Sequence, residues 1–452
     1  MQNIQNLMET LSGLVWGPYM LVLIVGTGVF LTLRLLFWQF RMLPLAFKQV
    51  FGKHPKNAHD GDISQFASLM TALSATIGTG NIAGVATACV LGGPGAVFWM
   101  WMTALFGMAT KYGEGVLAVK YRVKNENGEM SGGPMYYIER GLGSKWKWLA
   151  VLFALFGTLA SFGIGSSVQS NTVALAVENS LGVSTLTTGI VITAFSALVI
   201  LGGIKSISKA SSVIVPIMAL GYVIGGLIII FNNLDLVIPA LKMIFTYAFT
   251  GEAAVGGAIG AAIRYGVARG VFSNEAGMGS APIAAAAAKT DHPVRQGLVS
   301  MTGTFLDTII VCSITGIVLV MGFIMAGQTF GDQTGAVLTI SVFDKLLPGF
   351  GGWVVTFGII FFAYSTILGW SYYGEKCCTY LFGDKSILLY RLIYIASVFV
   401  GCVVTLDLVW LFADTFNGLM AAPNCIALLL LSGIIVKESK DFIARRKSGE
   451  LY

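Results

Sequence analysis

Two stretches place polar residues and glycines at depths where a membrane-spanning helix is expected to be apolar. Arg269–Ser280 reads RGVFSNEAGMGS between apolar flanks, and Ala72–Gly84 reads ALSATIGTGNIAG. Irregular backbone at membrane depth persists only where protein or a water-filled cavity surrounds it. Glycines of the small-xxx-small packing type are the alternative, but packing explains neither Asn81 nor the Ser-Asn-Glu run. The two stretches therefore predict interrupted helices around a polar binding site.

The chemistry of such a site follows from helix ends. Where a helix stops and restarts, unpaired N–H groups face the gap from one half and unpaired carbonyls from the other. N-termini near Ile82 and Ser273 would suit a carboxylate, and carbonyls ending near Ile77 and Gly270 would suit an ammonium group or a dehydrated Na⁺. A zwitterionic amino acid carries both charges, so one pair of broken helices can hold it.

The elements that position these stretches are membrane helices. The chain has 452 residues, of which 56% are hydrophobic and 11% charged, whereas soluble domains carry about 25% charged residues. Apolar segments recur along the chain and predict an all-α polytopic membrane protein. Eleven spans are expected, near 14–37, 65–91, 94–118, 147–170, 185–204, 209–231, 254–287, 297–326, 352–374, 388–405 and 408–436.

Orientation follows from the basic residues of alternate loops. Of the 28 Lys and Arg residues, 23 fall on one side, two (Lys242 and Lys345) on the other and three within spans. Basic loops mark the cytoplasmic side, so the N-terminus is expected outside and the C-terminus in the cytoplasm. The basic excess is thereby explained by topology, and no nucleic-acid partner is expected.

The six cysteines show neither metal-site nor disulfide-framework spacing.

Two outer connections are longer than hairpins and contain helix-permissive runs. These runs, 238–249 and 336–347, are expected to form short surface helices, either lids over a pathway or plain interfacial helices. Only 437–452 is expected to form a solvated cytoplasmic tail.

The two interruptions lie five spans apart, so their helices run in opposite directions. This spacing predicts two inverted repeats within one transporter domain, 65–231 and 254–436, with 14–37 as a peripheral N-terminal helix. Paired interrupted helices in corresponding positions indicate the binding site of a secondary transporter. A channel would need charge rings or a continuous polar face. A sensor would need an output domain, and an enzyme is disfavoured because the three histidines, His54, His59 and His292, all lie in loops.

Six ionisable residues lie within or at the ends of spans, where such residues are functional candidates. They are Lys111, Glu114, Arg264, Arg269, Glu275 and Asp307. Arg269 and Glu275 flank the second interruption and are expected to pair with each other or with Asp307. The open alternative is that Glu275 takes up a proton and supports H⁺ coupling.

Several motifs together resemble the alanine or glycine:cation symporter family. They are VWGP at 15–18, GTGN at 78–81, SGGPMY at 131–136, GGIK at 202–205, GVFSNEAG at 270–277 and YSTILGWSYYGE at 364–375. The resemblance covers essentially the whole chain. It implies a LeuT-type transporter with ten core helices in two inverted sets of five. It also implies Na⁺-coupled uptake of small neutral amino acids, chiefly alanine and glycine, by a monomer in the cell (inner) membrane. An H⁺-coupled carrier, or one preferring serine or glutamine, is the nearer alternative.

The resemblance also implies a substrate site. Thr79, Gly80 and Asn81 would cradle the carboxylate end, with Phe272, Ser273 and Asn274 on the opposite wall. Gln169 would supply an amide, and Trp370 would cap the side-chain end of the pocket. From the residues alone, Trp370 reads equally well as a packing aromatic, and Gln169 reads as a residue at the outer end of its span.

A Na⁺ site is implied in the same way, between the first interrupted helix and the ninth span. Its five oxygens would be the hydroxyls of Ser365 and Thr366 and the carbonyls of Ser74, Ile77 and Ala363. The alternative for the two hydroxyls is a hydrogen bond to a carbonyl of the preceding helical turn.

Overall fold

The computed structural model describes residues 2–52, 60–250, 259–329, 331, 333–404 and 407–451. The described chain is mostly helical, and its one small sheet pairs β1 (Val123–Lys124) with β2 (Met130–Ser131) antiparallel, Val123 opposite Ser131. The helices of the first half are α1 (Gln2–Val15), α2 (Pro18–Arg34), α3 (Trp38–Arg41), α4 (Leu43–Phe51), α5 (Gln65–Thr76), α6 (Ala83–Gly92), α7 (Ala96–Lys120), α8 (Pro134–Leu142), α9 (Lys147–Ala160), α10 (Val168–Leu181), α11 (Thr185–Ile200), α12 (Gly203–Asn232) and α13 (Leu234–Tyr247).

The second half begins with the other predicted interruption. Its helices are α14 (Ile259–Asn274), α15 (Ala281–Ala286), α16 (Pro293–Thr304), α17 (Ser313–Met325), α18 (Gly335–Leu346), α19 (Gly351–Phe382), α20 (Ile387–Val403), α21 (Asp407–Leu419), α22 (Ala421–Leu430) and α23 (Ser432–Lys447). Short turns of 3₁₀ helix occupy η1 (Thr79–Asn81), η2 (Ser144–Trp146) and η5 (Asp384–Ser386), and π-helical turns occupy η3 (Ser161–Ser167) and η4 (Phe305–Cys312).

The first predicted interruption is confirmed. Ser64 begins α5 by accepting a hydrogen bond from the Ala67 N–H at 3.1 Å, and the helix ends at Ile77. The single turn η1 then leads into α6. The sequence TIGTGN favours this stop because two glycines within three residues weaken the helix.

The second interruption lies further along the chain than expected. α14 continues through Asn274, and the irregular segment runs from Glu275, which has a φ of +53°, to Ser280. Gly277 and Gly279 carry φ values of +91° and +83° there. The expectation that a helix restarts near Ser273 is therefore wrong, because the residues that need left-handed backbone come after Asn274. The first residues of the expected span, 254–258, lie outside the described residues.

Among the described residues, six helical segments are long and apolar enough to cross a membrane, or seven if the pair 411–430 and 432–447, bent by 58°, counts as one span. The protein is thus a multi-pass helical membrane protein, but the expected count of eleven spans is not confirmed. One physical reason is that interruption leaves α5 and α6 with 12 and 10 residues, each short of the 20 or so that span a bilayer.

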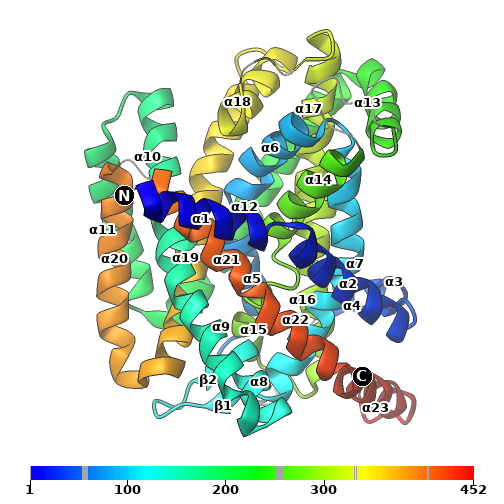
Figure 1. Ribbon diagram of the computed structural model, residues 1–452, viewed down its shortest axis with the longest axis vertical. Helices are drawn as coiled ribbons and strands as arrows, with labels where there is room; N and C mark the ends of the chain where they lie inside the picture. Colours follow the sequence, from blue (N-terminus) through cyan, green and yellow to red (C-terminus); the bar gives the residue numbers. More distant parts are fainter. Residues whose placement is uncertain are drawn as a thin grey trace.

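The two ends of the molecule differ in structure (Figure 1). Helices α13 and α18 lie at one end together with the end of α17, and they confirm the two predicted short helices. The β1–β2 hairpin and α8 lie at the opposite end. Within the tail expected at 437–452, residues up to 447 belong to helix α23, and the buried Glu438 pairs with Lys120 at 2.7 Å.

Candidate functional site

The two interrupted helices meet at their breaks. A Cβ added to Gly80 would lie 3.3 Å from both the Phe272 ring and the Ser273 Cα. The turn η1 therefore rests directly on the last turn of α14. Thr79, Gly80 and Asn81 are brought against Phe272 and Ser273, as the sequence predicted.

A single carboxylate ties the two breaks together. Asp307 lies in η4 and is fully buried. One of its oxygens accepts a hydrogen bond from Asn81 Nδ2 at 2.7 Å, and the other accepts from Ser273 Oγ at 3.0 Å and from Thr308 Oγ1 at 2.7 Å. Sequence reasoning singled out Asp307 as a charge within a span and as a partner for Arg269 or Glu275. Among the described residues its hydrogen bonds go instead to Asn81, Ser273 and Thr308. The structure adds Asp307 to the site.

The asparagines of the two motifs hold the irregular backbone. Asn81 Oδ1 accepts from the Gly78 N–H at 2.9 Å, and Asn274 Oδ1 accepts from the Ala276 N–H at 3.0 Å. Asn274 Nδ2 also donates to Thr308 Oγ1 at 3.2 Å. Each asparagine thus satisfies a backbone N–H that the interruption leaves without a helical partner.

The expected cation ligands gather where α19 crosses the end of α5. Ser365 Oγ lies within hydrogen-bond distance of the Ser74 carbonyl, at 3.2 Å. The Asn81 N–H donates to the Gly78 carbonyl, which leaves the Ile77 carbonyl outside the helical ladder. A Cβ added to Gly78 would lie 2.7 Å from Thr366 Oγ1. The buried Ala363 precedes these hydroxyls on α19.

The alternative for the two hydroxyls, a hydrogen bond to the preceding helical turn, is observed. Ser365 Oγ and Thr366 Oγ1 each lie 2.9 Å from the Phe362 carbonyl, to which they donate. A hydroxyl that donates its hydrogen to a carbonyl keeps two lone pairs. The hydrogen bond to the preceding turn therefore leaves each oxygen able to ligate a cation.

Gln169 faces the first interruption, so its reading as a residue at the outer end of the span is wrong. Its side chain is 2% exposed, and Nε2 donates to the Ile164 carbonyl at 3.0 Å. Its Oε1 has no hydrogen-bond partner within the described part of the chain and would lie 3.8 Å from a Cβ added to Gly78. The π-helical turn η3 just before it sets this orientation by changing the helical register.

Glu275 is held by Trp370 and Ser280. The Trp370 indole donates to Glu275 Oε1 at 3.2 Å, and Ser280 Oγ donates to Oε2. The expected ion pair of Glu275 with Arg269 is not formed among the described residues. Arg269 instead lies over the Phe272 ring, 5.6 Å from its centroid. Trp370 therefore contacts the second interruption as well as packing in the core.

An open vestibule leads to the breaks from the α6 and α14 side. Its lining includes Thr79, Gly80, Phe272, Arg269 and Asp414. The first three of these are among the residues predicted to surround a substrate.

The opposite side is closed. Ile63 pairs with Ala288 in an isolated parallel bridge, which joins the start of α5 to the end of α15. Arg122, which follows α7, donates to the carbonyls of Ala286 (3.0 Å), Ala288 (2.6 Å) and Asp60 (2.7 Å). We call these three hydrogen bonds the Arg122 latch, because they fasten the α5–α15 pair to α7.

Comparison with known proteins places the chain in a family. The model of the sodium:alanine symporter family matches residues 1–451. The chain is 60% identical over 445 residues to the sodium/alanine symporter AgcS of Methanococcus maripaludis, covering 98% of each chain. It is 40% identical over 451 residues to the probable sodium/glutamine symporter GlnT of Bacillus subtilis, covering 99% of this chain and 93% of that protein.

Among solved structures, the chain resembles that of MhsT in complex with L-phenylalanine. The TM-score is 0.56 at 12% identity, over 83% of this chain and 90% of that one. The likeness supports a LeuT-type transporter fold. The whole-chain match and the geometry of the two interruptions lead to one conclusion: this chain belongs to the sodium:alanine symporter family.

Proposed function

We propose that the protein is a symporter that couples Na⁺ entry to the uptake of alanine and glycine by alternating access. The observation that carries this proposal is the meeting of two interrupted helices at Gly80 and Phe272, beside a cluster of neutral oxygens on α5 and α19. Membership of the family and 60% identity to a sodium/alanine symporter support the same substrate and ion.

The substrate would lie between η1 and the end of α14. Thr79, Gly80 and Asn81 of η1 would cradle its carboxylate just ahead of the start of α6, where the helix dipole favours an anion. Phe272, Ser273 and Asn274 would form the opposite wall. The unpartnered Oε1 of Gln169 suits the ammonium group, because a buried acceptor without a donor is costly until one arrives. Trp370 would limit the size of the side chain.

The Na⁺ ion would bind beside this site. Its ligands would be the hydroxyls of Ser365 and Thr366 and the carbonyls of Ser74, Ile77 and Ala363. These are neutral hard oxygens, which suit an alkali cation. A Cβ added to Gly78 would lie 2.7 Å from Thr366 Oγ1 and 3.8 Å from Gln169 Oε1. The ion and the substrate would therefore share one stretch of backbone, which is a physical basis for coupling.

Alternating access would use the two inverted repeats, 65–231 and 254–436, with 14–37 peripheral to them. The vestibule would face outside, the Arg122 latch and the C-terminus would face the cytoplasm, and the N-terminus would lie outside. The distribution of basic residues supports this orientation. We further propose that the protein works as a monomer in the cell membrane.

The test is uptake of radiolabelled alanine into proteoliposomes with and without an inward Na⁺ gradient. Uptake should exceed that of empty liposomes only when the gradient is imposed, and unlabelled glycine should compete. Equal uptake with K⁺ replacing Na⁺ would refute Na⁺ coupling, and stimulation by a pH gradient alone would favour the H⁺-coupled alternative.

The matched variant is Thr366→Val, which keeps the side-chain shape and removes one proposed Na⁺ ligand. It should raise the Na⁺ requirement. Glutamine and serine belong among the competitors, because a relative at 40% identity is named a probable glutamine symporter.

A further inference from the structure

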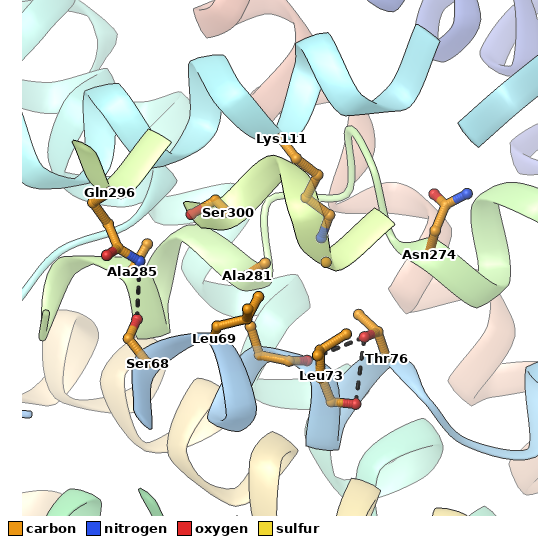
Figure 2. Close-up of a pocket in the computed structure, with 12 residues that line it drawn as sticks. Ser68, Leu69, Leu73, Thr76, Lys111, Asn274, Ala281, Ala285, Gln296 and Ser300 are labelled. Carbon is orange, nitrogen blue, oxygen red and sulfur yellow. Dashed lines mark hydrogen bonds between the residues drawn. The ribbon is translucent and has the colours of Figure 1, made fainter. Parts of the chain in front are cut away.

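A second polar cavity lies on the latch side of the two breaks. It is enclosed by α5, α7, α15 and α16, and the residues that matter to its chemistry are Ser68, Thr76, Lys111, Asn274, Gln296 and Ser300. Figure 2 shows the Lys111 ammonium projecting from α7 toward Ala281, with Thr76 and Asn274 nearby. The cavity has room for about one water molecule in this structure.

Lys111 is the unusual group in this cavity. Its side chain is 3% exposed, and its Nζ has no hydrogen-bond partner among the described residues. No described carboxylate forms an ion pair with it within 4 Å, although its charge acts at longer range on Glu114, Glu275 and Asp307. An ammonium group carries three donors, and burying a charge without close partners is costly. The structure thus retains a cation that offers unused donors to the cavity.

The rest of the cavity continues this polarity toward the latch. Gln296 Nε2 donates to Ser68 Oγ at 3.1 Å, while Gln296 Oε1 has no partner among the described residues. Further along, Gln65 Nε2 donates to Thr290 Oγ1 at 3.1 Å. A line of polar side chains therefore runs from Asn274, next to the second interruption, toward the start of α5 and the end of α15.

We propose that Lys111 forms a second, transient binding site for the substrate carboxylate, used between the central site and the latch side. The inference rests on the proposed function, because it concerns the route of the same amino acid. A fixed ammonium group attracts a carboxylate and repels Na⁺. The site therefore takes the carboxylate end of an amino acid, or another small carboxylate, and does not take the coupling ion.

The site is too small to fill in this structure and would open with the latch. Ser68 Oγ donates to the Ala284 carbonyl at 3.0 Å, so α5 and α15 are joined as one unit. When this unit moves away from α7 and α16, the cavity widens around Lys111. A carboxylate leaving η1 would then find unused donors along its route.

The test uses pyruvate, a three-carbon carboxylate without an ammonium group that is almost fully ionised at neutral pH. Labelled-alanine exchange is measured in right-side-out and inverted membrane vesicles, with pyruvate added to the accessible face. In the wild type, pyruvate should inhibit exchange several-fold more strongly from the latch face than from the vestibule face. Lys111→Met should lose this difference, and Lys111→Arg should keep it.

The matched control is Lys120→Met, at the end of the same helix, where Lys120 pairs with Glu438. It should be as sensitive to pyruvate as the wild type. Equal inhibition from both faces of the wild type, or no inhibition, overturns the inference without using any variant. The inference is also overturned if Lys111→Met keeps the wild-type difference in pyruvate inhibition between the two faces while its Na⁺-dependent alanine binding is intact. Failure of the wild type to transport alanine would instead refute the proposed function.

Discussion

Gly78 offers the sharpest perturbation of the proposed ion site. It directly follows the end of α5, and a Cβ added there would lie 2.7 Å from Thr366 Oγ1. Real Cβ contacts are essentially never under 3.0 Å, so Gly78→Ala must displace the hydroxyl. Thr366 Oγ1 is held by its 2.9 Å hydrogen bond to the Phe362 carbonyl, so displacing it costs that hydrogen bond or strains the side chain.

The size of the effect follows from these contacts. Forcing a side chain about 30° off its rotamer costs about 0.5–1.5 kcal/mol, and loss of the hydrogen bond adds about 0.5–1.5 kcal/mol. If the full cost of about 1–3 kcal/mol is lost from the free energy of Na⁺ binding, the Na⁺ concentration for half-maximal uptake rises roughly 5- to 150-fold. Alanine uptake measured over a Na⁺ titration in proteoliposomes gives this value directly.

Two companion variants make the reasoning refutable. Gly26→Ala is the control, because a Cβ at Gly26 meets no atom within 4 Å, and its Na⁺ dependence should match the wild type. The double variant Gly78→Ala/Thr366→Val should show less than the sum of the two single effects, because both act on one hydroxyl. An unchanged Na⁺ dependence in Gly78→Ala would show that this hydroxyl is not an ion ligand.

Two further predictions concern the groups that hold the breaks and the closed side. Asp307→Ala should lower thermal stability by about 2–5 kcal/mol, because it leaves buried donors unsatisfied, and should abolish uptake. Asp307→Asn keeps one acceptor oxygen and should destabilise less than Asp307→Ala. Equal melting temperatures for Asp307→Ala and wild type would contradict the assigned role. Arg122→Ala removes the latch and should favour opening on that side. A cysteine introduced at Ser300 should then be alkylated several-fold faster. Arg122→Lys should give an intermediate rate. An alkylation rate independent of residue 122 would refute the latch.

The first interruption was predictable almost to the residue, whereas the second was misplaced. Around Gly78 and Gly80 the sequence offers no competing explanation for polar residues at mid-depth. Gly270 was taken as part of the second break, but it lies within α14, where an added Cβ would meet Thr103 Oγ1 at 2.4 Å. It is a packing glycine against α7. Glycines that pack helices and glycines that break them look alike in sequence, and only backbone angles such as that of Gly277 distinguish them.

Long-range partners were beyond sequence reasoning. Asn81 and Asp307 are 226 positions apart, and no local pattern joins them. The same holds for Arg122 and Ala288, 166 positions apart. Sequence patterns expose periodicity, breaks and charge asymmetry, because those depend on neighbouring residues. The choice of which buried charge meets which break depends on how the helices pack.

The packing of the breaks constrains how the two interrupted helices can move. Asn81 and Ser273 bond to different oxygens of the same Asp307 carboxylate, so neither break can shift alone without losing a buried hydrogen bond. On the closed side, the Ile63–Ala288 bridge joins α5 to α15 in the same way. The half-helices are therefore coupled in pairs, one from each interrupted helix. Motion of such a pair against α7 and α19, rather than motion of a single helix, is the transition that this geometry favours.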